Sequence, residues 1–142
     1  MSGTIGRVTD RGSVATEMAI VAPVLFMLLM LVIFAGRVTD AQHQVLSAAH
    51  AAARAASLQG DELAAGAAAQ EAAEQNLKNG GLTCTPADVD ITAIDLAPPD
   101  GVVTVTVSCT ADVSNVALPG IPGSQTFTAE STEVVDRYRG TG

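Results

Sequence analysis

The sequence predicts an α+β protein: a long amino-terminal helix, a second helix, and a small antiparallel sheet of about three strands. Three observations support this fold class. Met18–Ala35 is a run of 18 apolar or small residues without a charge. The stretch from Arg37 to Ser57 is rich in Ala and contains neither Pro nor Gly. After Gly81 the spacing of apolar residues changes from the helical period to a period of two.

The composition limits the chain to one small domain with an anchor. Its 142 residues include only 3% aromatic residues and no Trp, so Ala and Val must supply most of any core. The net charge is −8, and from Arg37 onward five basic residues face thirteen acidic ones. No basic patch exists to neutralise phosphates, so we expect no binding to nucleic acid.

Residues 13–36 are predicted to form a transmembrane helix. An 18-residue helix is about 27 Å long, which is close to the thickness of the hydrocarbon core of a membrane. The run exceeds the 7–15 apolar residues typical of a secretory signal, although a long signal peptide is the alternative. Residues 1–12 form a short basic leader with Arg7 and Arg11, which favours a cytoplasmic amino terminus and an extracytoplasmic carboxyl-terminal part.

Residues 37–80 are predicted to form two extracytoplasmic Ala-rich helices. In the first, polar and apolar residues fall on separate stripes. The polar stripe, predicted to face solvent, contains His43, Ser47, His50, Arg54 and Ser57, and the apolar stripe contains Val38, Val45, Ala49, Ala52 and Ala56. The two His could share a metal, but no carboxylate or Cys stands near them in the sequence, so we expect no metal site. Asp61 is positioned to cap the second helix, which should run to about Leu77 and stop at Asn79-Gly80-Gly81.

Residues 81–142 are predicted to form a small β-domain. Its strands are expected at Val89–Leu96, Val102–Val113 and Gln125–Val135, with a turn at 98–101. The central strand has the clearest alternation, with Val103, Val105, Val107 and Cys109 on one face.

Cys84 and Cys109 both lie in this β-domain. An even number of Cys outside the cytoplasm favours a disulfide between them, which would contribute roughly 3–4 kcal/mol by the chain-entropy model. Two separate buried thiols are the alternative.

The sequence carries no recognisable catalytic constellation. It has no glycine-rich phosphate loop and no nucleophile placed beside a base, and its acidic residues are scattered singly. We therefore expect a protein that is not an enzyme and needs no cofactor.

The residues before the apolar run resemble the processing site of type IV prepilins. In Arg11-Gly12-Ser13-Val14-Ala15-Thr16-Glu17, a short basic leader ends in Gly and a Glu follows five positions later. The resemblance is closest to the TadE-like proteins of the tight-adherence pilus system. It rests on the order of Arg11-Gly12-Ser13, Glu17, Ala19, Pro23, the apolar run, Gly36-Arg37 and the Ala-rich stretch 48–56. Met18 departs from the pattern, since an aromatic residue commonly follows the Glu in that family.

The resemblance implies a minor pilin or pseudopilin that takes part in assembling a tight-adherence pilus or a related secretion or adhesion machine. A membrane prepilin peptidase would cut between Gly12 and Ser13. The new ammonium of Ser13 could then pair with Glu17 of a neighbouring subunit. The implied partners are the membrane, this peptidase, other pilin-like subunits and pilus assembly proteins.

A second interpretation does not involve processing. The chain could be an uncleaved single-pass protein that tethers a small extracellular binding domain to the cell envelope. Glu17 would then be an acid favoured by the dipole at the start of a helix. This explains Glu17 but not the Arg-Gly-Ser sequence ahead of it.

Overall fold

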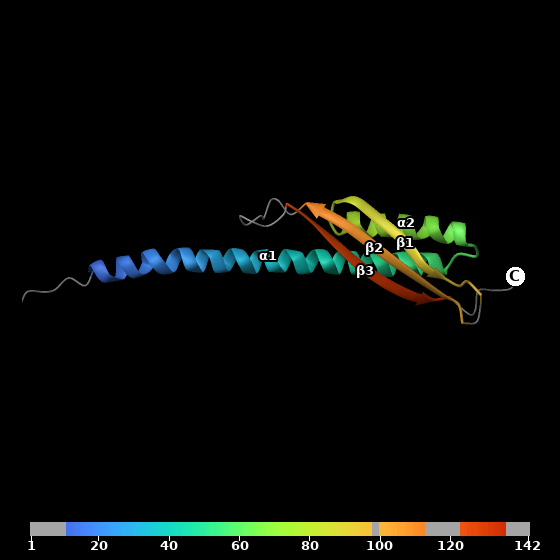
Figure 1. The fold of residues 1–142 in the computed structure, drawn as a ribbon, viewed down its shortest axis with the longest axis horizontal. Coiled ribbons are helices and arrows are strands. Elements are labelled where there is room, and N and C mark those ends of the chain that lie inside the picture. Colours follow the sequence, from blue (N-terminus) through green and yellow to red (C-terminus); the bar gives the residue numbers. More distant parts are fainter. Residues whose placement is uncertain (1–10, 98–99, 113–122, 136–142) are drawn as a thin grey trace, which may run out of the picture. The chain divides into compact units, whose positions relative to one another are not determined.

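The computed structural model describes residues 11–97, 100–112 and 123–135. The elements follow one another as α1 (Arg11–Ser57), α2 (Glu62–Asn79), β1 (Cys84–Ile94), β2 (Val102–Asp112) and β3 (Ser124–Val134). They form two helices and one three-stranded antiparallel sheet (Figure 1). The predicted α+β class and the order of its elements are confirmed. Residues 1–10 of the predicted leader and Pro98-Pro99 of the predicted turn lie outside the described residues.

The chain divides into two compact units, residues 1–37 and residues 38–142. Helix α1 is continuous across the division, and it contains Pro23 without an interruption of the helix. The described residues of the hydrophobic core all belong to the second unit. The two units are therefore distinct in their packing, although one helix contributes to both.

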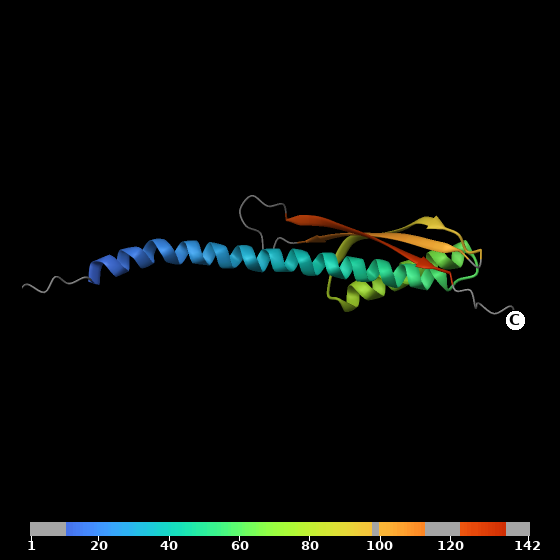
Figure 2. The ribbon, with the colours of Figure 1, turned by 90° about the horizontal axis from the view of Figure 1, so that it is seen from below.

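In the second unit, one side of α1 is buried in the hydrophobic core. The predicted apolar stripe is confirmed, because Val45, Ala49, Ala52 and Ala56 are buried and Val38 is partly buried. Three more alanines are also buried: Ala41, Ala48 and Ala53. The buried stripe is wider than predicted because α1 is covered both by the sheet and by α2 (Figure 2).

One residue of the predicted polar stripe was placed wrongly. His43, Ser47, His50 and Arg54 are exposed as expected, but Ser57 retains only 5% of its accessible surface. Its hydroxyl donates to the carbonyl of Arg54 at 2.9 Å, which satisfies it inside the helix.

Helix α2 begins as the sequence predicts. The carboxylate of Asp61 accepts a hydrogen bond from the amide of Ala64 at 2.9 Å, and Glu62 lies in the first turn. The helix ends at Asn79, within the predicted stop at Asn79-Gly80-Gly81, and the amide of Gly80 donates to the carbonyl of Asn76. Its buried residues recur every four positions: Ala65, Ala69, Ala73 and Leu77. This stripe consists largely of alanine, so it permits a close approach to neighbouring elements.

The sheet has the order β1-β2-β3, and its central strand agrees with the prediction. Val103, Val105, Val107 and Cys109 are fully buried. Strand β1 spans Cys84–Ile94 instead of the predicted Val89–Leu96, and β3 spans Ser124–Val134 instead of Gln125–Val135. The early start of β1 follows from pairing with β2, since Cys84 lies opposite Ala111. The sequence around Thr85-Pro86 does not alternate, so local pattern could not reveal this extension.

The helices cover one face of the sheet, and the other face is polar (Figure 2). On this open face, four successive pairs of opposing side chains on β2 and β3 form hydrogen bonds with each other. The pairs are Thr104–Thr132 and Thr110–Thr126 at 2.9 Å, Ser108–Thr128 at 3.2 Å and Thr106–Glu130 at 3.4 Å.

Candidate functional sites: an exposed apolar helix and a polar cluster under the sheet

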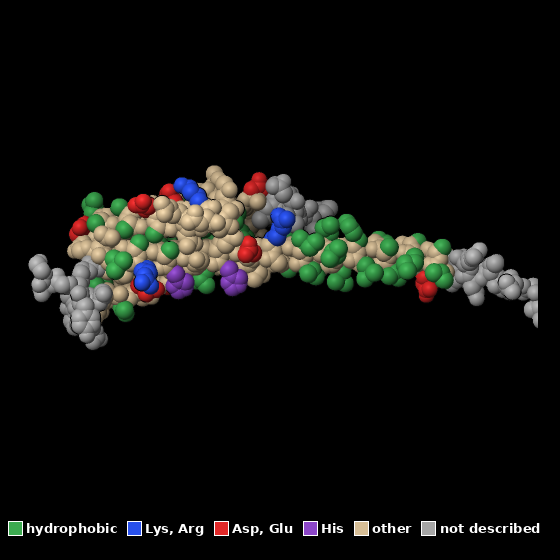
Figure 3. Space-filling view, turned by 180° about the vertical axis from the view of Figure 1, so that it is seen from behind, with side chains coloured by type: hydrophobic (Ala, Val, Ile, Leu, Met, Phe, Trp, Pro, Cys, Tyr) green, Lys and Arg blue, Asp and Glu red, His purple; other side chains and the backbone are tan. Residues whose placement is uncertain are grey.

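The first unit exposes apolar side chains around α1. From Val14 to Leu29 every side chain is exposed, including Ile20 at 66% and Met27 at 71%. Hydrophobic side chains cover this part of the helix in the space-filling view (Figure 3). Among the described residues, α1 is the one helix long and apolar enough to cross a membrane. A helix that is apolar on all sides is stable only when lipid or other apolar helices surround it.

Glu17 lies at the amino-terminal end of this apolar stretch. Gly12 and Ser13 belong to the first turn of α1, so the predicted processing residues and Glu17 are all parts of one helix. The side chain of Glu17 is exposed, and among the described residues no hydrogen bond or ion pair reaches it. A carboxylate placed beside an apolar helix in a membrane needs a cation to offset its desolvation.

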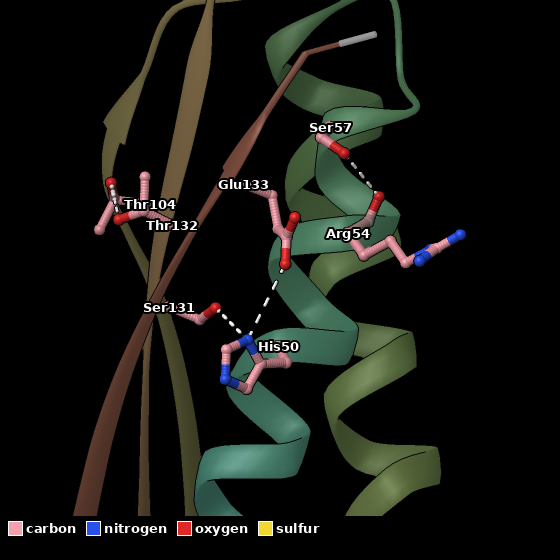
Figure 4. Close-up of polar contacts among 7 residues, drawn as sticks. All are labelled: His50, Arg54, Ser57, Thr104, Ser131, Thr132 and Glu133. Carbon is pink, nitrogen blue, oxygen red and sulfur yellow. Dashed lines mark hydrogen bonds and ion pairs between the residues drawn. The ribbon is translucent and has the colours of Figure 1, made fainter.

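A polar cluster joins α1 to β3 in the second unit (Figure 4). The Nδ1 atom of His50 lies 2.6 Å from the hydroxyl of Ser131, and Ser131 is buried. The same Nδ1 atom lies 3.8 Å from a carboxylate oxygen of Glu133. The side chains of His50 and Glu133 are 58% and 39% exposed, so solvent screens their ion pair and it contributes little to stability.

The cluster contains the residue types of a catalytic triad, but its geometry differs from one. In a triad the serine and the carboxylate bond to opposite nitrogens of the imidazole, so that one nitrogen takes the proton while the other is held by the acid. Here Ser131 and Glu133 both approach Nδ1 of His50. The arrangement connects a helix to a strand, and it does not hold the serine against an oriented base.

The two histidines do not come together. His43 and His50 are both exposed on α1 two turns apart, and His50 contacts Ser131 and Glu133 of β3. Among the described residues no group of three or more His, Cys, Asp or Glu is placed to hold a metal ion.

Cys84 and Cys109 form a disulfide that joins β1 to β2, as the sequence predicted. Their Cα atoms are 5.1 Å apart, which lies within the usual range for such bonds. Cys109 is buried, whereas Cys84 is partly exposed and lines a groove between the end of α2 and the start of β1. The bond therefore fixes the edge strand β1 to the central strand near this groove.

The sequence did not single out Ser131 and Glu133. The alternation of the strand could have identified them, because every second residue from 127 to 135 lies on the inner face of the sheet. A Ser and a Glu at core-facing positions predict a polar partner on the covering element. His50 supplies that partner, but only the packing of α1 beneath β3 identifies it.

Comparison with known families supports the resemblance seen in the sequence. Residues 12–54 match the family described as TadE-like protein. The match covers most of α1 and ends before α2 and the sheet. No curated protein and no solved structure matches the chain.

Proposed function

We propose that this chain, whose residues 12–54 match the TadE-like family, is a membrane-anchored minor pilin or pseudopilin that takes part in assembling a tight-adherence pilus or a related machine. The observation that carries the proposal is the exposed apolar half of α1, which begins at a Gly-Ser bond and a Glu in prepilin spacing. Such a helix can pack among similar helices in the membrane or in a filament. The second unit would remain outside the membrane.

The proposed processing step is hydrolysis of the Gly12–Ser13 peptide bond by a prepilin peptidase. Water supplies the hydroxyl of the new Gly12 carboxylate and a proton of the new Ser13 amine. The absence of a Cβ atom in Gly12 supports this assignment, because it leaves the bond unhindered for the peptidase. After cleavage, the Ser13 ammonium would be available to offset the charge of Glu17 on a neighbouring subunit.

The orientation is part of the same proposal. Arg7 and Arg11 precede the apolar stretch, so the leader would lie in the cytoplasm, where the peptidase cuts, and residues 38–142 would lie outside. The disulfide between β1 and β2 supports an extracytoplasmic position, because disulfides persist in oxidising compartments.

We also propose that the chain is not an enzyme. The support comes from the polar cluster, in which Ser131 and Glu133 share one nitrogen of His50 and so do not form a nucleophile with an oriented base.

The decisive experiment is coexpression of the full chain with a prepilin peptidase of the tight-adherence system, followed by amino-terminal sequencing and intact-mass measurement. We expect chains that begin at Ser13. The Gly12→Val variant should remain uncut, and Gly6→Val is a matched control that should be cut normally. If the peptidase leaves the wild-type chain intact, the second interpretation, an uncleaved tether for a small extracellular domain, replaces this one.

A further inference from the structure

The outer edge of β3 is a surface that the proposed function does not use. In the order β1-β2-β3, both outer strands have one side without a neighbouring strand among the residues that the structure describes. The backbone groups on such an edge can pair with an added strand, and proteins usually protect them with prolines, bulges or a covering element.

The edge of β1 is protected in these ways. Its pairing with β2 is irregular at two places, between Cys84 and Ala87 and between Ile91 and Ala93. Pro86 lies in the first irregular stretch and has no amide hydrogen to donate. Helix α2 also contacts this strand. An added strand would therefore find no regular ladder on this side.

The edge of β3 has neither a proline nor an irregular pairing to protect it. Its register with β2 runs without a shift from Val134 opposite Val102 to Ser124 opposite Asp112, and β3 contains no proline. The amide of Val135 donates to the carbonyl of Gly101 at 2.8 Å, which identifies the residues whose backbone faces β2. Because these alternate in an antiparallel pair, the backbone groups of Glu130, Thr132 and Val134 turn to the open edge.

One outward group of β3 is already occupied. The side-chain amide of Gln42 donates to the carbonyl of Thr128 at 3.0 Å, and so α1 covers the edge at this point. Among the described residues, no partner from outside the sheet reaches the backbone of Glu130, Thr132 or Val134. The uncovered edge is therefore the carboxyl-terminal part of β3.

This part of the strand is held in place from beneath. Ser131 and Glu133, which alternate with the outward residues, both approach His50 on α1 (Figure 4). A strand fixed in extended form loses little further freedom when a partner pairs with it, and such preorganisation favours binding.

The charge of the neighbouring surface favours a basic partner. Glu130 lies on the open face of the sheet, where its carboxylate accepts a hydrogen bond from Thr106 of β2. On the other side of Thr106, Asp90 of β1 occupies the opposing position, so two carboxylates belong to this row across the sheet. Strand β3 contains two carboxylates and no Lys or Arg. A second copy of the chain would bring the same carboxylates to the edge, whereas a Lys or Arg opposite Glu130 would stabilise the pairing.

We propose that the edge of β3 from Glu130 to Val134 binds an extended segment of a partner protein, which adds a fourth strand and places a Lys or Arg beside Glu130. Recognition would combine main-chain hydrogen bonds along the edge with one charge contact on the open face. This inference does not depend on cleavage at Gly12, since the edge is the same in the cut and the uncut chain.

The test uses the full chain in detergent micelles and a labelled synthetic peptide of alternating Thr and Val with one central Lys. Binding is measured by fluorescence anisotropy for the wild type, Thr132→Pro and Thr132→Ala. Both variants lose the hydroxyl contact with Thr104. Only the Pro variant also loses the backbone amide hydrogen of residue 132, which points to the open edge and does not bond to β2. We expect Thr132→Pro to weaken binding by about tenfold or more, equivalent to about 1.4 kcal/mol, and Thr132→Ala to bind nearly as the wild type does.

A charge exchange tests the partner chemistry and remains informative if Thr132→Pro does not fold. Glu130→Lys should weaken binding of the Lys peptide and strengthen binding of the same peptide with a central Glu. Equal binding of both peptides by both proteins would overturn the basic partner. Self-association of the wild type that Thr132→Pro abolishes would show that a second copy occupies the edge, and it would also overturn the proposal.

Discussion

At the scale of single residues, Gly101 lies where neighbouring backbone atoms leave little space for a side chain. It is buried between β1 and β2, and a Cβ atom there would lie 2.5 Å from the carbonyl oxygen of Asp95 and 3.0 Å from that of Ala97. Both are backbone atoms, so neither can rotate away. We expect Gly101→Ala to lower the free energy of unfolding by about 1–3 kcal/mol, measured by urea denaturation of the purified chain.

Gly66 provides a matched control in the opposite direction. It lies inside α2, and a Cβ atom there would meet nothing within 4 Å. Gly66→Ala should raise the free energy of unfolding by about 0.5–1 kcal/mol, because Ala reduces the entropy lost when the helix forms. Equal effects of the two substitutions would contradict the crowding assigned to Gly101.

Glu17 gives a prediction about assembly, which rests on the proposed function. Glu17→Gln is nearly isosteric and removes only the charge, so the variant should still insert into the membrane and still be cut. It should fail to co-assemble with partner pilins, because the Ser13 ammonium of a neighbour would lose its counter-ion. Crosslinking of processed subunits compares the variant with the wild type. Normal assembly of the variant would return Glu17 to the role of an acid at the start of a helix.

At the scale of elements, the contact of α1 with β3 includes the hydrogen bond between His50 and Ser131. His50→Ala and Ser131→Ala each remove one partner of a part-buried hydrogen bond. A double-mutant cycle should give a coupling of about 0.5–1.5 kcal/mol in the free energy of unfolding. The corresponding cycle for His50 and Glu133 should give a smaller coupling, since both side chains are more than one-third exposed. A larger coupling for Glu133 would contradict this ranking.

The disulfide is the covalent link between two elements. It joins β1 to β2 across a sequence separation of 25 residues. The chain-entropy model gives a loss of about 3–4 kcal/mol in the free energy of unfolding when the bond is removed. Comparison of the oxidised and the fully reduced chain by thermal melting measures this loss. Unreduced protein from an oxidising compartment should be two hydrogens lighter than reduced protein by mass spectrometry, and two freely alkylated thiols would contradict the bond.

At the scale of the whole molecule, the hydrophobic core and the exposed apolar residues of α1 belong to different units. Among the described residues, the hydrophobic core draws only on the second unit, while the apolar residues from Val14 to Leu29 are exposed. We expect residues 38–142 alone to be folded and monomeric in water, as judged by circular dichroism and sedimentation. The full chain should need detergent or lipid to stay dispersed. Unfolding of the isolated 38–142 fragment would mean that the first unit contributes to its stability.

Some features of the fold could be predicted from the sequence and others could not. The apolar stripe of α1, the cap of α2 at Asp61 and the alternation of β2 are local patterns, and the structure confirms them. The start of β1 at Cys84 was missed because it depends on pairing with Ala111, which is distant in the sequence. The burial of Ser57 was missed because a stripe drawn on an isolated helix does not show how far its neighbours extend around it.

The sequence by itself determined the α+β class, the apolar helix and the resemblance around Gly12, Ser13 and Glu17, and it favoured the Cys84–Cys109 disulfide that the structure confirms. The periodicity of apolar residues, the length of an uncharged apolar run and short motifs are properties of neighbouring residues, so they can be recognised without knowledge of the fold. Only the tertiary structure decided that His50 meets Ser131 and Glu133, and that β3 has a regular edge with few covering contacts. The first feature joins residues about 80 positions apart in the sequence. The second depends on the order of the strands in the sheet. Both are therefore set by the packing of the chain and not by local sequence patterns.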